Sequence, residues 1–179
     1  MRPIGFIAAS MLACVAAPAP AQTFGPPIGG MCLMSRAGAI GAARAGQSMQ
    51  AQLKQMQAAL NGELAQRRAA LDQQRRQLEA RQGAIAPIEY QRQLAALGQQ
   101  SQSLDQQQNA RFIVAQQRGQ QQIDRALNEA LGRVVTRNAC SVVMERDHAY
   151  GWNNAMDITP AVAKEMDAIL PSVALNNPD

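Results

Sequence analysis

Gly83-Ala84-Ile85-Ala86-Pro87 interrupts a Gln-rich, Gly-poor segment that extends from about Ala45 to Arg137. Pro87 cannot continue a preceding helix because it lacks a backbone N–H, and it disfavours helical geometry at Ala86. On both sides of this break, the helix-favouring residues Ala, Gln, Leu and Arg dominate. The sequence therefore predicts a mainly α fold in which two long helices form an antiparallel, coiled-coil-like hairpin over about residues 45–133.

Apolar residues recur at helical spacing along the first half of this hairpin, which residues 37–46, rich in Gly and Ala, precede. They are separated first by four, three and four residues and then mostly by seven: Met49, Leu53, Met56, Leu60, Leu64, Leu71, Leu78 and Ile85. This spacing is typical of a coiled-coil seam. Arg and Gln occupy the partner positions of the later seam, so we expect a partly hydrated contact. About 40 residues per helix would reach about 60 Å.

Short apolar runs flank the hairpin and predict a small β-rich body at its base. Residues 31–35 precede the hairpin and residues 139–145 follow it, and each run suits one short buried strand. A C-terminal helix is expected at about 160–170, with Thr159 as its cap and Pro160 in its first turn. The body is therefore expected to combine both ends of the chain.

The cysteines agree with an exported protein. Cys14 lies in the N-terminal apolar run, which leaves Cys32 and Cys140 as an even pair. A disulfide between them would close a loop of about 100 residues, which the chain-entropy model values at about 4 to 5 kcal/mol. The alternative is that both are buried free thiols. A zinc site is excluded because His148 is the only histidine and no cysteine pair has ligand spacing.

The N-terminus has the three parts of a bacterial secretory signal. Arg2 supplies a positive charge, residues 4–17 form an apolar run, and Ala19-Pro20-Ala21 provides the small residues that signal peptidase requires. Cleavage is expected between Ala21 and Gln22. The sequence therefore predicts export to the periplasm.

An alternative is a lipoprotein box at residues 11–14, with Cys14 acylated, but it shortens the apolar run and leaves the Ala-x-Ala site unused. On the first interpretation, residues 1–21 are the signal peptide. Residues 22–179 are then short enough to form one domain.

Composition and charge limit the classes of function. Between Arg36 and Arg137, basic residues outnumber acidic residues about two to one, whereas the region after Asn138 is acidic. The excess of arginine is compatible with nucleic-acid binding, but no aromatic residues interleave the arginines and the signal peptide argues against it. A single histidine, together with the lack of a phosphate loop or clustered carboxylates, argues against an enzyme. No cofactor is expected.

The whole layout resembles the Skp/OmpH family of periplasmic chaperones. The most specific stretch runs from Ser141 to Leu170, in which Val142-Val143, Ala149-Tyr150 and Asp157-Ile158-Thr159 follow the family's order. The resemblance covers essentially the whole mature chain. It implies a homotrimer with a β-rich body and three helical arms around a cavity, acting as an ATP-independent holdase for unfolded outer-membrane β-barrel proteins.

Two sets of residues follow as candidates for these roles. Client contacts are expected among apolar residues of the arms: Met49, Met56, Leu71, Leu78, Ile85, Leu94 and Leu97. Trimer contacts are expected in the body, at Leu33, Val142 and Val143. The basic arms would also attract an anionic membrane surface or lipopolysaccharide. The arms are richer in Gln and poorer in Lys than expected for the family, so the family's lipopolysaccharide-contacting residues cannot be transferred.

One alternative of a different class is a structural coiled-coil protein of the cell envelope. It would explain both the hairpin and the export signal. It would not require the β segments at both ends, and the core positions of heptads in such proteins are usually more consistently apolar. The native mass of the protein, and its ability to keep a barrel precursor soluble, would distinguish the two.

Overall fold

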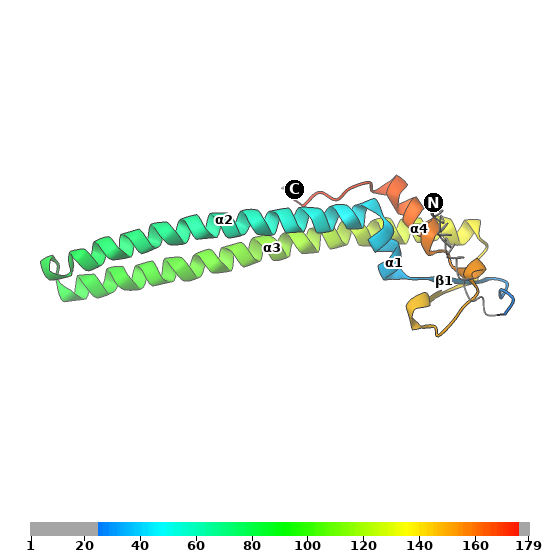
Figure 1. Cartoon of the computed structure of the whole chain (residues 1–179), viewed down its shortest axis with the longest axis horizontal. Coiled ribbons are helices and arrows are strands. Elements are labelled where there is room, and N and C mark those ends of the chain that lie inside the picture. The colour runs from blue at the N-terminus through cyan, green and yellow to red at the C-terminus, as the bar shows by residue number, and fades with distance from the viewer. Residues whose placement is uncertain (1–24, 176–179) are drawn as a thin grey trace, which may run out of the picture.

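The computed structural model describes residues 25–175, so the predicted signal peptide and its cleavage site lie outside the described residues. Within that range the fold is mainly helical with a small strand region (Figure 1). The elements follow one another in this order: β1 (Met31–Met34), α1 (Arg36–Ala42), α2 (Arg44–Ala80), α3 (Pro87–Arg137), β2 (Val142–Glu145) and α4 (Thr159–Ile169).

The two long helices α2 and α3 form the predicted antiparallel hairpin, which projects from a body at its base (Figure 1). Their 37 and 51 residues correspond to about 55 Å and about 77 Å of helix. The turn lies where the sequence predicts it. A single 3₁₀ turn, Gln82–Ala84, follows α2, and Pro87 occupies the first turn of α3.

The strands β1 and β2 are parallel, with Met31 opposite Val142 and Met34 opposite Glu145. The whole hairpin is the connection between them. Asp157 forms an isolated bridge to Leu33 on β1. Among the described residues, β2 therefore has only one strand neighbour, and its other edge is open.

The stretch before the hairpin is itself helical, which the sequence interpretation missed. Helix α1 begins after Ser35, whose Oγ accepts a hydrogen bond from the Gly38 N–H at 2.8 Å. A Cβ atom on Gly38 would lie 2.9 Å from that same Oγ. Ala39 is fully buried. The small residues therefore let α1 pack closely against its neighbours.

The predicted cap of α4 was wrong in detail. Ile158 occupies the cap position without a side-chain hydrogen bond, and Thr159 is the first helical residue. The Thr159 hydroxyl instead accepts a hydrogen bond from the Ser35 N–H at 2.9 Å and donates one to Asp157. This hydroxyl links the end of β1 to the start of α4, a long-range contact that local capping rules do not anticipate.

The hydrophobic core lies at the body end of the hairpin. It is formed where α1 and α4 pack against the ends of α2 and α3 nearest the body, and its largest fully buried apolar side chains are Ile123, Leu127, Val134, Val162 and Met166. Toward the tip, isolated leucines of the two helices are buried outside this cluster. Within residues 25–175 no helix is both long and apolar enough to cross a membrane.

Candidate functional site

The chain continues to pack against the hairpin after the end of α4. After Leu170, residues 171–175 turn back along the hairpin and lie against it (Figure 1); we call this segment the C-terminal strap. Val173 and Leu175 are 4% and 3% exposed, whereas Ala174 between them is exposed. This alternation is that of an extended chain, in which successive side chains point in opposite directions.

Two glutamine side chains hold the backbone of the strap. Gln52 of α2 donates its Nε2–H to the Val173 carbonyl at 2.8 Å. Gln122 of α3 donates to the Ala174 carbonyl at 2.9 Å and accepts from the Ala174 N–H at 3.0 Å. These contacts pair both polar groups of the Ala174 backbone and the Val173 carbonyl, which would be costly to leave unpaired next to buried side chains.

A glycine on α3 makes room for the strap. A Cβ atom at Gly119 would lie 2.7 Å from Leu175 Cδ2 and 3.2 Å from Met49 Sδ. Because Gly119 has no side chain, Leu175 can lie close against the helix backbone. The sequence analysis did not single out Gly119, whose missing side chain leaves space for Leu175 of the strap.

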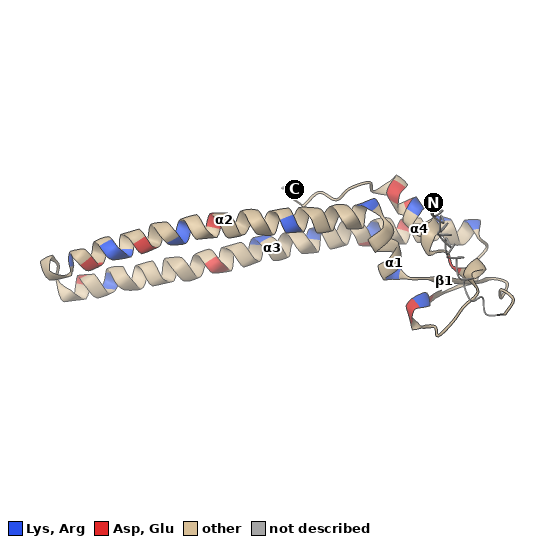
Figure 2. Cartoon of the chain, viewed as in Figure 1, with Lys and Arg blue, Asp and Glu red and all other residues tan. Residues whose placement is uncertain are grey.

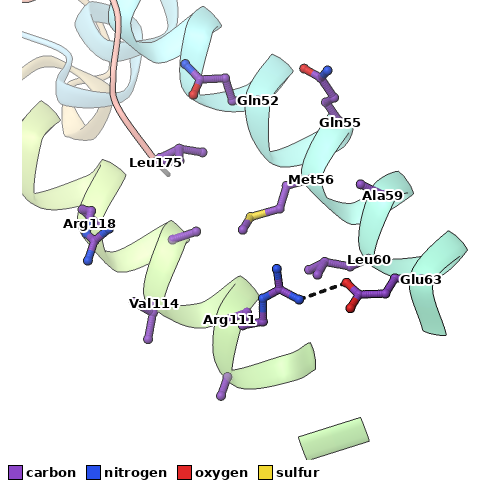
Figure 3. A pocket seen from close by; sticks show the side chains of 12 residues that line it. Gln52, Gln55, Met56, Ala59, Leu60, Glu63, Arg111, Val114, Arg118 and Leu175 are labelled. Carbon is purple, nitrogen blue, oxygen red and sulfur yellow. Dashed lines mark hydrogen bonds and ion pairs between the residues drawn. The ribbon is translucent and has the colours of Figure 1, made fainter. Parts of the chain in front are cut away.

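A groove between α2 and α3 continues beyond Leu175 toward the tip, with a volume of about 820 Å³. Met56 and Leu60 of α2 point toward α3, and Leu175 lies at the end nearest the body (Figure 3). The full lining is Gln52, Gln55, Met56, Ala59, Leu60, Glu63, Ala110, Arg111, Val114, Ala115, Arg118 and Leu175.

An ion pair crosses the groove at its outer end. Arg111 of α3 donates to Glu63 of α2 at 3.0 Å (Figure 3), and Arg67 of α2 pairs with the same carboxylate. The hydrogen bond from Arg111 is the main reason that the pKa of Glu63 is lowered, followed by a hydrogen bond from Gln108. Glu63 is therefore charged at neutral pH. The groove combines apolar side chains with glutamines and Arg118 along its walls and has a charged outer end.

The predicted client-contact residues are distributed over different environments. Met56 lines the groove. Met49 lies in the core, and Leu71 and Leu78 are buried in the seam between the helices. Ile85 in the turn and Leu94 and Leu97 near the start of α3 are half-buried. The buried residues join the helices in the isolated chain, and Met56 is the predicted residue that lines the groove.

Exposed apolar side chains of α3 were missed by the sequence interpretation. Ile88 is 81% exposed near the turn, and Ile113 and Val114 are about half exposed near the groove. Their departure from the buried stripe of α3 is the signal that could have identified them.

The predicted body residues also differ from one another. Leu33 is buried inside the chain and Val143 is half-buried against the core. Val142 is 46% exposed, and Met144, on the same face of β2, is also exposed. Of the three predicted residues, Val142 is the most exposed.

A disulfide joins Cys32 of β1 to Cys140, just before β2, with Cα atoms 5.8 Å apart. It closes the loop that contains the whole hairpin. His148 is exposed, in a 3₁₀ turn. Across residues 25–175 no cluster of His, Cys, Asp or Glu could hold a metal ion.

Ion pairs neutralise much of the acidic body. Glu165 of α4 accepts hydrogen bonds from Arg137 at 2.6 Å and Arg133 at 3.0 Å, and these contacts, Arg137 first, lower the pKa of Glu165. Arg146 pairs with Asp157 at 2.8 Å. Along the hairpin, charges of both signs are dispersed over both helices rather than gathered into one patch (Figure 2).

Comparison with known proteins identifies the family. The model of the OmpH family, described as outer membrane protein (OmpH-like), matches residues 32–166. A crystal structure of a candidate outer membrane chaperone (OmpH-like) from Caulobacter crescentus is 28% identical and covers 86% of this chain and 93% of its own, with a TM-score of 0.73. Curated proteins give no match. The chain, with its disulfide-closed body and its long helical hairpin, belongs to the Skp/OmpH family.

Proposed function

We propose that this protein is a periplasmic, ATP-independent holdase chaperone that binds unfolded outer-membrane β-barrel proteins and prevents their aggregation. The observation that carries the proposal is the hairpin itself. Beyond the core its helices contact each other through a thin seam, and they leave a groove and scattered apolar side chains accessible. Such a surface suits weak, adaptable contacts with a chain that must later be released.

The chemistry of the client supports the proposal. A barrel precursor in water carries strands in which apolar and polar residues alternate, and these strands aggregate through their edges. Weak contacts at several places on long arms would separate such strands. Family membership, and the relative described as an outer membrane chaperone, support the same function.

We also propose that the protein acts as a homotrimer that assembles through the body. The open edge of β2 has unpaired backbone groups, which favour pairing with another strand. Val142 and Met144 expose apolar surface on that strand, and Tyr150 is fully exposed nearby in the sequence. These groups would be covered between subunits.

The predicted signal peptide supports a periplasmic location. The excess of arginine on the hairpin supports peripheral contact with an anionic membrane surface or lipopolysaccharide, over a Debye length of about 8 Å at physiological salt. Because many of these arginines are paired with acidic residues, we expect this contact to be weak and sensitive to salt.

The test is the native mass of the mature protein by light scattering, alone and with a urea-diluted outer-membrane barrel precursor. We expect a trimer that takes up the precursor into one soluble complex. A monomer, or a trimer that leaves the precursor to precipitate, would favour a structural coiled-coil protein of the envelope instead.

A substitution in β2 tests the assembly surface. Val142→Asp would place a charge at an exposed apolar position, so it should dissociate the trimer without unfolding the chain. Ala161→Asp, at an exposed position on α4, is the matched control and should keep the native mass. A Val142→Asp protein that remains trimeric by light scattering would place the assembly surface elsewhere.

A further inference from the structure

We propose that the groove beyond Leu175 binds one extended segment of an unfolded outer-membrane protein, in which apolar and polar residues alternate. The proposal rests on the holding function proposed above and assigns it a binding subsite. Its basis is the C-terminal strap, because the strap shows how the adjoining part of the same groove holds an extended chain (Figure 3).

The strap has the side-chain pattern of a barrel strand. Val173 and Leu175 are buried against the helices and Ala174 faces outward. Strands of outer-membrane barrels alternate in the same way, with apolar residues at every second position. A client segment could therefore continue the arrangement of the strap, with its apolar side chains against Met56 and Leu60.

The backbone contacts of the strap do not depend on its sequence. Gln52 and Gln122 bond the backbone of Val173 and Ala174, and every peptide offers those same groups. Gln55, three residues beyond Gln52, lines the open part of the groove with another amide that can donate and accept. Met56 adds an adaptable apolar contact. Together these residues suit a binder of many different strands.

The size of the groove sets the length of the segment. Gly119, beside Leu175, and Arg111, at the outer end, are eight residues apart on α3, which is about 12 Å of helix. An extended chain rises about 3.3 Å per residue, so about four residues fit, with two apolar side chains turned inward. A contact this small is weak, as release without ATP requires.

The sequence of the C-terminus argues for an external occupant. The sequence after Leu175 is Asn176-Asn177-Pro178-Asp179, which contains no large apolar side chain. Amide and carboxylate side chains gain less than apolar ones from contact with Met56 and Leu60, the apolar part of the lining. A client strand with an apolar residue at every second position fits that part better.

Site-specific photo-crosslinking tests the proposal. Benzoylphenylalanine is placed either at Ala59, which lines the groove, or at Ala58, an exposed alanine beside it that does not. The probe is a peptide of about nine residues, the length of a membrane-spanning strand, with alternating Leu and Ser. The control peptide has the same composition with its leucines contiguous.

We expect the alternating peptide to crosslink at Ala59 about tenfold more than at Ala58, the preference that about one buried apolar side chain provides. The contiguous peptide should crosslink less at Ala59. Equal labelling at both positions, or no preference between peptides, would overturn the proposal. So would labelling that appears only after residues 176–179 are deleted, because the chain's own end would then occupy the groove.

A pair of lysine variants separates this subsite from the holding function. Met56→Lys should weaken binding of the alternating peptide about tenfold, since it places a charge beside Leu60 in the apolar part of the groove. Ala58→Lys carries the same charge outside the groove and should change binding less than about twofold. If wild-type protein keeps a barrel precursor soluble but the two variants bind peptide equally, the subsite is wrong and the holding function stands. If the precursor precipitates while the peptide still labels Ala59, the holding function fails and the subsite stands.

Discussion

Gln108 is a buried polar residue in the thin seam between α2 and α3. It is 7% exposed, and its Oε1 has no hydrogen-bond partner among the described residues. An unpaired buried acceptor costs about 1 to 3 kcal/mol. Gln108→Leu should therefore raise the free energy of unfolding by about 1 kcal/mol, after allowing for its lost bond to Glu63, in thermal or urea denaturation.

The control for this prediction is the exposed neighbour Gln106, where Gln106→Leu should change stability by less than about 0.5 kcal/mol. A Gln108→Leu protein less stable than wild type would mean that its bond to Glu63 outweighs the unpaired oxygen. The polar side chain of Gln108 would then stabilise the contact between α2 and α3 rather than weaken it.

Glu165 makes the stability of the body depend on pH. Hydrogen bonds from Arg137 and Arg133 lower its pKa in the folded state. A lowered carboxylate pKa contributes stability that is complete above the unfolded value and is lost as pH falls through the folded one. The melting temperature should therefore decrease as the pH is lowered below about 4.5, the ordinary pKa of a glutamate. Glu165→Gln should make that fall shallower; an unchanged slope would assign the acid sensitivity to other carboxylates.

At the scale of elements, the disulfide links the two ends of the hairpin. Cys32 and Cys140 are 108 residues apart in sequence, so the chain-entropy model values their bond at about 4 to 5 kcal/mol. The double variant Cys32→Ser/Cys140→Ser should unfold at a lower temperature. Its far-UV circular dichroism at low temperature should remain that of a helical protein, because α2 and α3 do not include either cysteine.

Reductant provides the control for this prediction. It should lower the midpoint of the wild-type protein to that of the double variant and leave the double variant unchanged. A wild-type midpoint insensitive to reductant under conditions that break the bond would show that body packing alone sets the stability.

The elements differ in how well sequence predicts them. The hairpin and its turn at Pro87 follow from local rules, because helical spacing and a proline break act over a few residues. Helix α1 was missed because Gly38 and Gly41 weaken the helical signal of its alanines, and the close packing that its small residues allow is visible only in the structure. The strap was missed because the three-residue alternation that ends at Leu175 is too short to stand out without the groove that it fills.

The same limit applies to the candidate site. Heptad spacing correctly marks Leu71 and Leu78 as apolar positions, but it does not distinguish a residue that joins two helices from one that faces a client. Met56 differs from them only because the adjoining part of α3 leaves space beside it. The residues that line the other side of that space, from Ala110 to Arg118 on α3 and Leu175 of the strap, are more than 50 residues away in sequence.

At the scale of the whole molecule, the body and the arm are expected to have separate tasks. Replacing residues 70–97 with the native turn, residues 81–86, would remove eleven residues each from α2 (70–80) and α3 (87–97) and leave the body intact. The native mass by light scattering should therefore stay that of the trimer. The shortened arms should suppress aggregation of a barrel precursor less well, because they offer less length to separate its strands.

Crosslinking of the alternating peptide to this shortened protein tests which part of the arm binds the client. The groove lies between Leu175 and Arg111, on the body side of the removed tip, so labelling at Ala59 should remain as in the full chain. Loss of holding with retained labelling would mean that the groove anchors one strand while the tip encloses the rest of the client. Full holding by the shortened protein would instead place the whole binding surface near the body, where the strap already holds an extended chain.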